Sequence, residues 1–61
     1  MNRNQIRAKL VERGITLAEI ARELNVTISA VSKVLASASV SARIRQRVAE
    51  RLDTTVKHLW P

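Results

Sequence analysis

The chain has 61 residues, of which 46% are hydrophobic, and a formal net charge of +6 at pH 7. This length predicts a single domain, residues 1–61, close to the lower limit for folding alone, so oligomerisation or ligand binding is expected to add stability. The 11 Lys and Arg against 5 Asp and Glu favour a polyanionic partner, nucleic acid first, and the absence of cysteine excludes disulfides and thiolate metal sites.

The residue types favour an all-helical fold. Only one residue is aromatic, so the core is aliphatic, and one Gly and one Pro leave few hairpin turns for strands. No apolar run reaches the ~18 residues of a membrane span, and the first residues lack the apolar core of a secretory signal. We therefore expect an all-α, compact bundle of about five short helices, located in the cytoplasm and without membrane contact.

The first predicted helix begins after Asn2 or Asn4 and ends near Arg13. Gly14 takes the left-handed position that closes the helix, and Ile15 packs across its end. Its inward residues are Ile6 and Leu10. Its solvent side has four cations, for which solvation and phosphate contact are about equally favoured: Arg3, Arg7, Lys9 and Arg13.

Residues 17–35 predict two short helices joined by a tight turn. The apolar stripe of the earlier helix follows the i, i+3, i+4, i+7 spacing and consists of Leu17, Ile20, Ala21 and Leu24. Thr16 precedes this stripe and Glu19 follows three residues later, which predicts a reciprocal capping box. Asn25 tolerates the left-handed conformation of a helix end, Val26 turns inward, and Thr27 caps the next helix.

The helix after Thr27 has two distinct sides. Its core side consists of Val31, Val34 and Leu35, and another face is shared by Ser29, Ser32 and Lys33. Residues 36–39, with the sequence ASAS, form a small flexible connection. This connection is either a plain connector or a loop whose hydroxyls and free backbone amides lie against a phosphate.

Ser39 or Ser41 caps a fourth predicted helix. Its core side follows an i, i+4 series: Val40, Ile44, Val48 and Leu52. A parallel row contains Arg43, Arg47 and Arg51, and like charges at this spacing cost a few tenths of a kcal/mol per pair. Because the row opposes helix stability, a functional role is expected for it, and phosphate binding is favoured most for Arg43. Glu50 and Asp53 partly relieve the repulsion between the arginines.

Thr55 caps a last turn, residues 56–60, which Pro61 ends. The apolar residues of this turn are predicted to fold back onto the first and fourth helices: Val56, Leu59 and Trp60. Trp60, the only aromatic residue, is expected to be a core or interface anchor rather than a base-stacking group. His58 has no other His or Cys as a partner, so a surface or packed histidine is preferred to a metal ligand.

The spacing in residues 17–35 resembles the helix-turn-helix of DNA-binding regulators. In that motif Leu17 is the first position and Ala21 the fifth, where only a small side chain lets the two helices cross closely. Asn25 departs from the pattern, which usually has glycine at the turn. The remaining slots are the buried turn residue and two core positions of the recognition helix, held by Val26, Val31 and Val34.

The order of a basic first helix, a helix-turn-helix, a further helix and a short last helix is similar to that of the lambda-repressor-like DNA-binding domains, which are five-helix bundles. The ending HLWP resembles that of the Ner-like regulators of transposable phages, and a Cro-like prophage regulator fits almost as well. The resemblance implies a sequence-specific regulator, a repressor of phage or prophage type, bound to double-stranded operator DNA. It also implies a homodimer, at least on DNA, with half-sites about one helical turn apart.

If the helix that starts near Thr27 enters the major groove, its side chains outside the core face the base edges. The predicted base-contacting residues are Thr27, Ile28, Ser29, Ser32 and Lys33. Lys33 is the best candidate for guanine O6 and N7, with a phosphate contact of equal weight. Because this set lacks Arg, Asn and Gln, DNA shape, water or a second copy must add specificity. The predicted phosphate-binding residues are Thr16, Leu17, Arg22, Ser37, Ser39 and Arg43.

No pair of nucleophile and base is supported by a motif, a glycine-rich loop or paired carboxylates, so neither catalysis nor a cofactor is expected. Two other hypotheses stay open. One is a protein-interaction module, such as an antitoxin-like or accessory subunit. The other is a charge-driven, sequence-neutral binder of nucleic acid.

Overall fold

Five helices and no strand make up the chain in the computed structural model, which describes residues 1–61. The helices are α1 (Arg3–Glu12), α2 (Leu17–Leu24), α3 (Ile28–Leu35), α4 (Ala42–Arg51) and α5 (Val56–Leu59). This confirms the predicted all-α fold with about five short helices. None of the five has the length and apolarity that crossing a bilayer would need.

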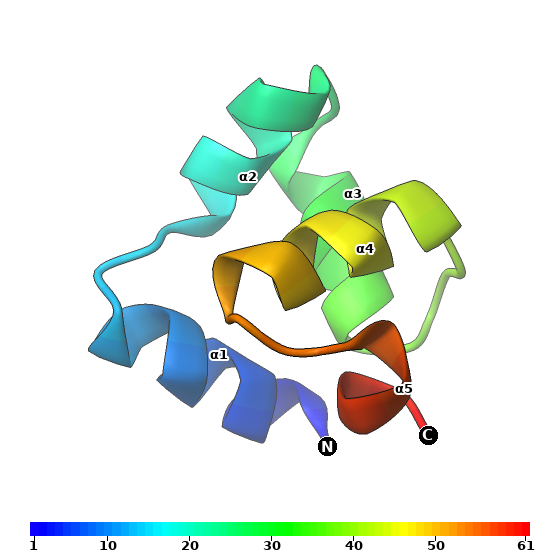
Figure 1. The fold of residues 1–61 in the computed structure, drawn as a ribbon. Helices are drawn as coiled ribbons and strands as arrows, with labels where there is room; N and C mark the ends of the chain where they lie inside the picture. Colours follow the sequence, from blue (N-terminus) through cyan, green and yellow to red (C-terminus); the bar gives the residue numbers. More distant parts are fainter.

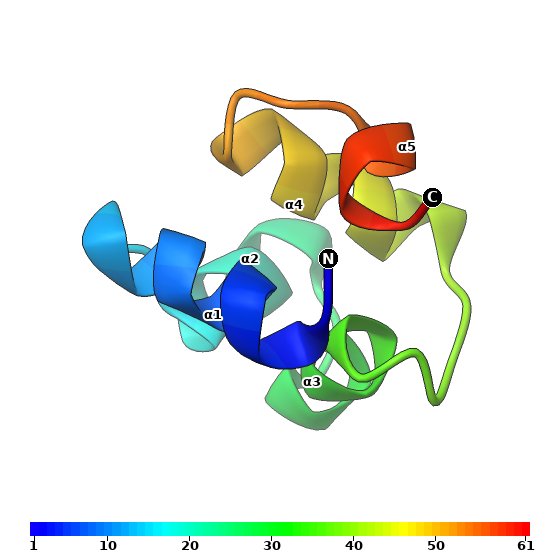
Figure 2. The same ribbon diagram turned by 90° about the horizontal axis from the view of Figure 1, so that it is seen from below.

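Helices α2 and α3 pack against each other and form a pair (Figure 1). Helix α4 contacts both members of this pair, and α1 contacts α3. Helix α5 packs on α4, which brings the two chain ends close together (Figures 1 and 2). The amino group of Met1 donates a hydrogen bond of 2.8 Å to the carbonyl oxygen of Leu59, so the chain ends are joined by a direct contact.

The core consists of aliphatic side chains from every helix. All 14 buried residues are hydrophobic, and no polar or charged residue is buried. The predicted inward positions of the helix-turn-helix are confirmed at Ile20, Ala21, Leu24, Val31, Val34 and Leu35. Leu17 and Val26 are half-buried against this core rather than fully enclosed.

A polar side chain begins each helix by accepting a hydrogen bond from a backbone amide three residues later. These N-caps are Asn2, Thr16, Thr27, Ser41 and Thr55. Each satisfies one of the amides that an α-helix leaves unpaired at its start. Asn2 is the cap rather than Asn4, and Ser41 rather than Ser39. Asn2 also forms a full capping box with Gln5, which the sequence pattern did not reveal.

The four longer helices end in the same way, with one residue in the left-handed conformation. These residues are Gly14, Asn25, Ser37 and Asp53, with φ of 68°, 58°, 59° and 56°. After α2, for example, the amide of Val26 donates to the carbonyl of Ala21 and the amide of Asn25 to that of Arg22. This pair of bonds defines the Schellman motif, which satisfies carbonyls at the helix end. The closure predicted at Gly14 and Asn25 is confirmed.

Two details of the predicted helix starts are wrong. Val40 was expected in the core, but it precedes the cap residue of α4 and is 76% exposed. The i, i+4 series therefore begins one turn later, at Ile44. At the start of α2, Thr16 Oγ1 accepts from the amide of Glu19, but the Glu19 carboxylate does not return to Thr16. It binds Arg51 of α4 instead, so the capping box is only half formed.

Candidate nucleic-acid interface

Helices α2 and α3 form a helix-turn-helix whose angle is set at Asn25. This residue has φ 58° and ψ 44°, a conformation that few residues other than glycine tolerate. Ala21, 3% exposed, has a side chain small enough for the two helices to pack closely. Val31 and Val34 of α3 are buried. Since these residues occupy the inner side of α3, its other side must face outward.

The outward side of α3 holds the residues predicted to contact bases. Thr27, Ser29 and Lys33 are exposed, and Ser32 is half-buried. Ile28 is 52% exposed despite its apolar side chain. Thr27 Oγ1 accepts from the amide of Ala30 at 3.1 Å, so this oxygen caps the helix while its hydroxyl hydrogen stays available. The protein's own bulk does not cover this face.

The start of α2 offers backbone amides to an anion. The amide of Glu19 is bound by Thr16 Oγ1, and the first intrahelical bond is donated by Ile20 to Thr16. The amides of Leu17 and Ala18 have no partner within the chain, as expected at the positive end of a helix dipole. The Arg22 side chain is exposed and forms no ion pair.

Two backbone amides in the connection between α3 and α4 are bound to the end of α3. The amide of Ser37 donates to the carbonyl of Val34, and that of Ala38 donates to the carbonyl of Lys33, both at the end of α3. The amides of Ser37 and Ala38 are therefore not free to bind a phosphate, so the alternative with free backbone amides does not hold at these two residues. The side chains of Ser37 and Ser39 remain exposed, so only their hydroxyls stay candidates.

Arg43, the favoured phosphate ligand in the arginine row of α4, has a contact inside the protein. Its Nη2 donates a hydrogen bond of 2.8 Å to the carbonyl oxygen of Leu24, at the end of α2. This bond satisfies a carbonyl that the helix itself leaves unpaired and joins α4 to the turn of the helix-turn-helix. A guanidinium has five N–H donors, so the remaining ones stay available to a phosphate.

The other two arginines of the row form ion pairs within the protein. Arg51 binds the carboxylates of Glu19 and Glu23, and Arg47 lies 3.5 Å from Glu23 and 3.7 Å from Glu50. Asp53 pairs instead with Arg13, with 3.9 Å between Nη1 and Oδ2. The repulsion expected along α4 is thus offset by acids that lie 24 to 32 residues earlier in the chain, which helical spacing cannot reveal.

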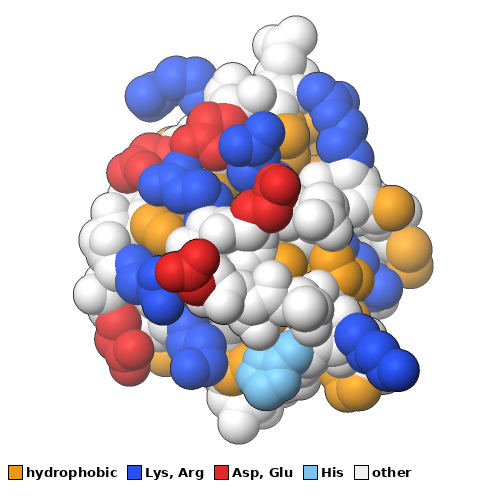
Figure 3. All heavy atoms as spheres, viewed as in Figure 1, with side chains coloured by type: hydrophobic (Ala, Val, Ile, Leu, Met, Phe, Trp, Pro, Cys, Tyr) orange, Lys and Arg blue, Asp and Glu red, His pale blue; other side chains and the backbone are white.

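Charges are therefore sorted over the surface. Acidic and basic side chains lie close together on the face that shows α4 (Figure 3). Helix α3 contains no acidic residue, and neither does the turn before it. Four of the five acids take part in ion pairs, namely Glu19, Glu23, Glu50 and Asp53. Arg22 of α2 and Lys33 of α3 are exposed and form no ion pair, and unpaired cations of this kind favour binding to a phosphate backbone.

The comparison with protein families agrees with this geometry. A family described as winged helix-turn-helix DNA-binding matches residues 1–61. The chain belongs to this family. As a member of the winged helix-turn-helix DNA-binding family, it is a DNA-binding domain over its whole length. The chain itself has no strand, so the wing of the family description has no counterpart here. Neither the search of curated proteins nor the search of solved structures gave a match.

The last turn supports the bundle and lies outside the helix-turn-helix. Trp60 is half-buried against the core, as predicted for an anchor, and the guanidinium of Arg45 lies 5.0 Å from its ring centroid. This cation–π contact between α4 and the chain end was not predicted, because Arg45 has no sequence signal beyond its charge. His58 is exposed, and no group of three or more His, Cys, Asp or Glu side chains converges.

Proposed function

We propose that this helix-turn-helix domain is a sequence-specific transcriptional regulator, a repressor of phage or prophage type that acts in the cytoplasm of a bacterial cell. The observation that supports this most strongly is the outward face of α3, which combines exposed polar residues with the absence of any acid. The proposed contacts to base edges are made by Thr27, Ile28, Ser29, Ser32 and Lys33. The lambda-repressor-like layout, with a Ner-like or Cro-like relationship, belongs to the same proposal.

The phosphate backbone is held on both sides of α3. The unpaired amides of Leu17 and Ala18 bind one phosphate at the start of α2, with the Thr16 hydroxyl beside them. The other proposed phosphate contacts come from Arg22, Ser37, Ser39 and Arg43. In this proposal Arg43 binds a phosphate and also donates its hydrogen bond to the Leu24 carbonyl at the end of α2. Each neutralised phosphate steepens the salt dependence by about 0.9 in log K per log salt.

The polar but mostly short side chains of α3 discriminate bases weakly, since a serine hydroxyl both donates and accepts. Two copies on paired half-sites would double the number of base contacts. We therefore propose a homodimer on operator DNA, with half-sites about one helical turn apart.

A gel-shift experiment at two salt concentrations tests the proposal. A duplex enriched by the protein from a random-sequence pool is compared with its scrambled version. A repressor binds the enriched duplex more tightly and loses affinity steeply with salt. Equal binding to both duplexes points to a sequence-neutral binder, and weak binding to both points to a protein-interaction module. Either of these results contradicts the proposal.

A further inference from the structure

Two of the three exposed large hydrophobic residues meet in one groove. Val11 of α1 is 72% exposed and Ile28 of α3 is 52% exposed. Both line a groove of about 290 Å³ between α1 and the start of the helix-turn-helix, and five of its seven lining residues are hydrophobic. Exposing apolar surface to water is unfavourable, and a groove lined mainly by apolar side chains is typical of a binding surface.

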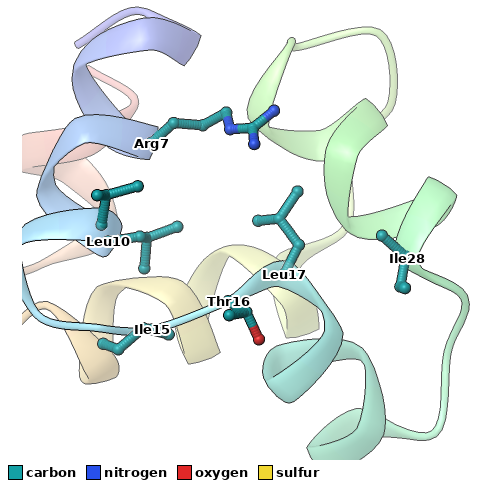
Figure 4. Close-up of a pocket in the computed structure, with 7 residues that line it drawn as sticks. Arg7, Leu10, Ile15, Thr16, Leu17 and Ile28 are labelled. Atoms are coloured by element: carbon teal, nitrogen blue, oxygen red, sulfur yellow. The ribbon is translucent and has the colours of Figure 1, made fainter.

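Arg7 is the one charged residue of the groove. Figure 4 shows its side chain extending from α1 above Leu17, toward α3. It forms no ion pair with any acid of the chain. An anionic group in the groove would therefore meet a guanidinium with all its N–H donors unused by other charged groups.

The groove is continuous with the proposed DNA interface. Thr16 and Leu17, at the start of α2, form one of its walls, and Ile28, at the start of α3, forms another (Figure 4). The first two are proposed phosphate contacts and the third a proposed base contact. A DNA strand bound by the start of α2 and read by the start of α3 must pass beside this opening.

We propose that the groove binds one deoxyribose–phosphate unit of the DNA backbone, which extends the interface from the helix-turn-helix onto α1. The phosphate binds Arg7, and the C–H groups of the sugar pack on Val11 and Leu17. The apolar lining of the groove matches the C–H groups of the sugar, and its single cation matches the phosphate. This inference rests on the proposed function, since it names a further part of the same DNA contact.

The structure separates Arg7 from the other cations of α1. Arg13 is paired with Asp53. Lys9 is exposed on the same helix but does not line the groove. Arg7 and Lys9 therefore provide a matched pair of variants. Both are cations of α1, but only Arg7 lines the groove.

The test compares Arg7→Gln with Lys9→Gln on the enriched duplex, by fluorescence anisotropy between about 50 and 200 mM salt. Loss of one phosphate contact lowers the slope of log K against log salt by about 0.9. Over this fourfold range of salt concentration, the affinity of the variant therefore falls about 3.5-fold less than that of the wild type. We expect this change for Arg7→Gln and a clearly smaller one for Lys9→Gln. Thermal unfolding of both variants checks that the fold is intact.

Hydroxyl-radical footprinting, which reports access to deoxyribose C–H groups, tests the apolar half. Val11→Ser should lose protection at one sugar position that the wild-type protein protects, while Lys9→Gln keeps it. Identical footprints for the wild type and Val11→Ser, or equal salt slopes for Arg7→Gln and Lys9→Gln, would overturn the inference while leaving the proposed function intact. A wild-type protein that enriches and binds no duplex overturns both.

Discussion

At the scale of single residues, Asn25 controls the direction in which α3 leaves α2. The left-handed conformation costs an ordinary L-residue about 1–2 kcal/mol, and Asn less, because its short polar side chain tolerates it. Only such a residue lets the amides of Asn25 and Val26 reach the carbonyls of Arg22 and Ala21. The outward face of α3 is thus positioned by one backbone conformation.

Asn25→Gly is expected to match the stability of the wild type or exceed it by up to about 1 kcal/mol, because glycine adopts this conformation without a steric penalty while losing more entropy on folding. Asn25→Ala is expected to lower the free energy of unfolding by about 1 kcal/mol, since Cβ makes the same conformation unfavourable. Urea denaturation followed by Trp60 fluorescence measures both. A wild-type value for Asn25→Ala would mean that the turn exerts no strain.

At the scale of elements, α4 acts as a support for α2. Arg43 binds the carbonyl of Leu24, and Arg51 binds the carboxylates of Glu19 and Glu23. These contacts hold both ends of α2 against α4. The arginine row thus has a structural role in fixing the helix-turn-helix, to which Arg47 also contributes through its ion pair with Glu23.

Arg51→Gln is expected to lower the free energy of unfolding by about 0.2–1 kcal/mol, the range for surface ion pairs. It should leave the salt slope of DNA binding unchanged. Lys33→Gln is the control, since Lys33 is exposed on α3 and forms no ion pair. It should weaken binding at least several-fold with no loss of stability. A salt slope that becomes less steep for Arg51→Gln, as much as for Lys33→Gln, would place Arg51 in the DNA contact.

The elements show what the sequence can predict. Helix starts and ends depend on neighbours within a few residues, so the caps at Thr16 and Thr27 and the closures at Gly14 and Asn25 were predictable. The inner side of α3 followed from its periodicity. Contacts between distant segments have no such local signal, which is why the pairing of Arg51 with Glu19 was missed.

The same reason explains the errors nearer the interface. The spacing of Val40 from Ile44 predicts a core position in the fourth helix. Because Ser41 is the N-cap of α4, however, Val40 precedes the helix and is exposed. The groove at Arg7 joins α1 to residues of two other helices, so only the fold could reveal it.

At the scale of the whole molecule, the chain is a small block of 24 × 24 × 18 Å. The acids that take part in ion pairs bind arginines of α4 or Arg13. The net charge of +6 therefore acts mainly through cations outside these pairs. These unpaired cations attract a polyanion such as DNA.

Nuclear magnetic resonance titration locates the DNA contact without changing the protein, so it tests whether α3 is the recognition helix. The ¹⁵N-labelled domain is titrated with the enriched duplex, and the shift of each backbone amide is followed. We expect the largest shifts at residues 16–17 and 27–33, and little change at residues 47–51. Large shifts confined to residues 47–51 and 56–60, with residues 27–33 unchanged, would show that DNA binds elsewhere and that α3 is not the recognition helix.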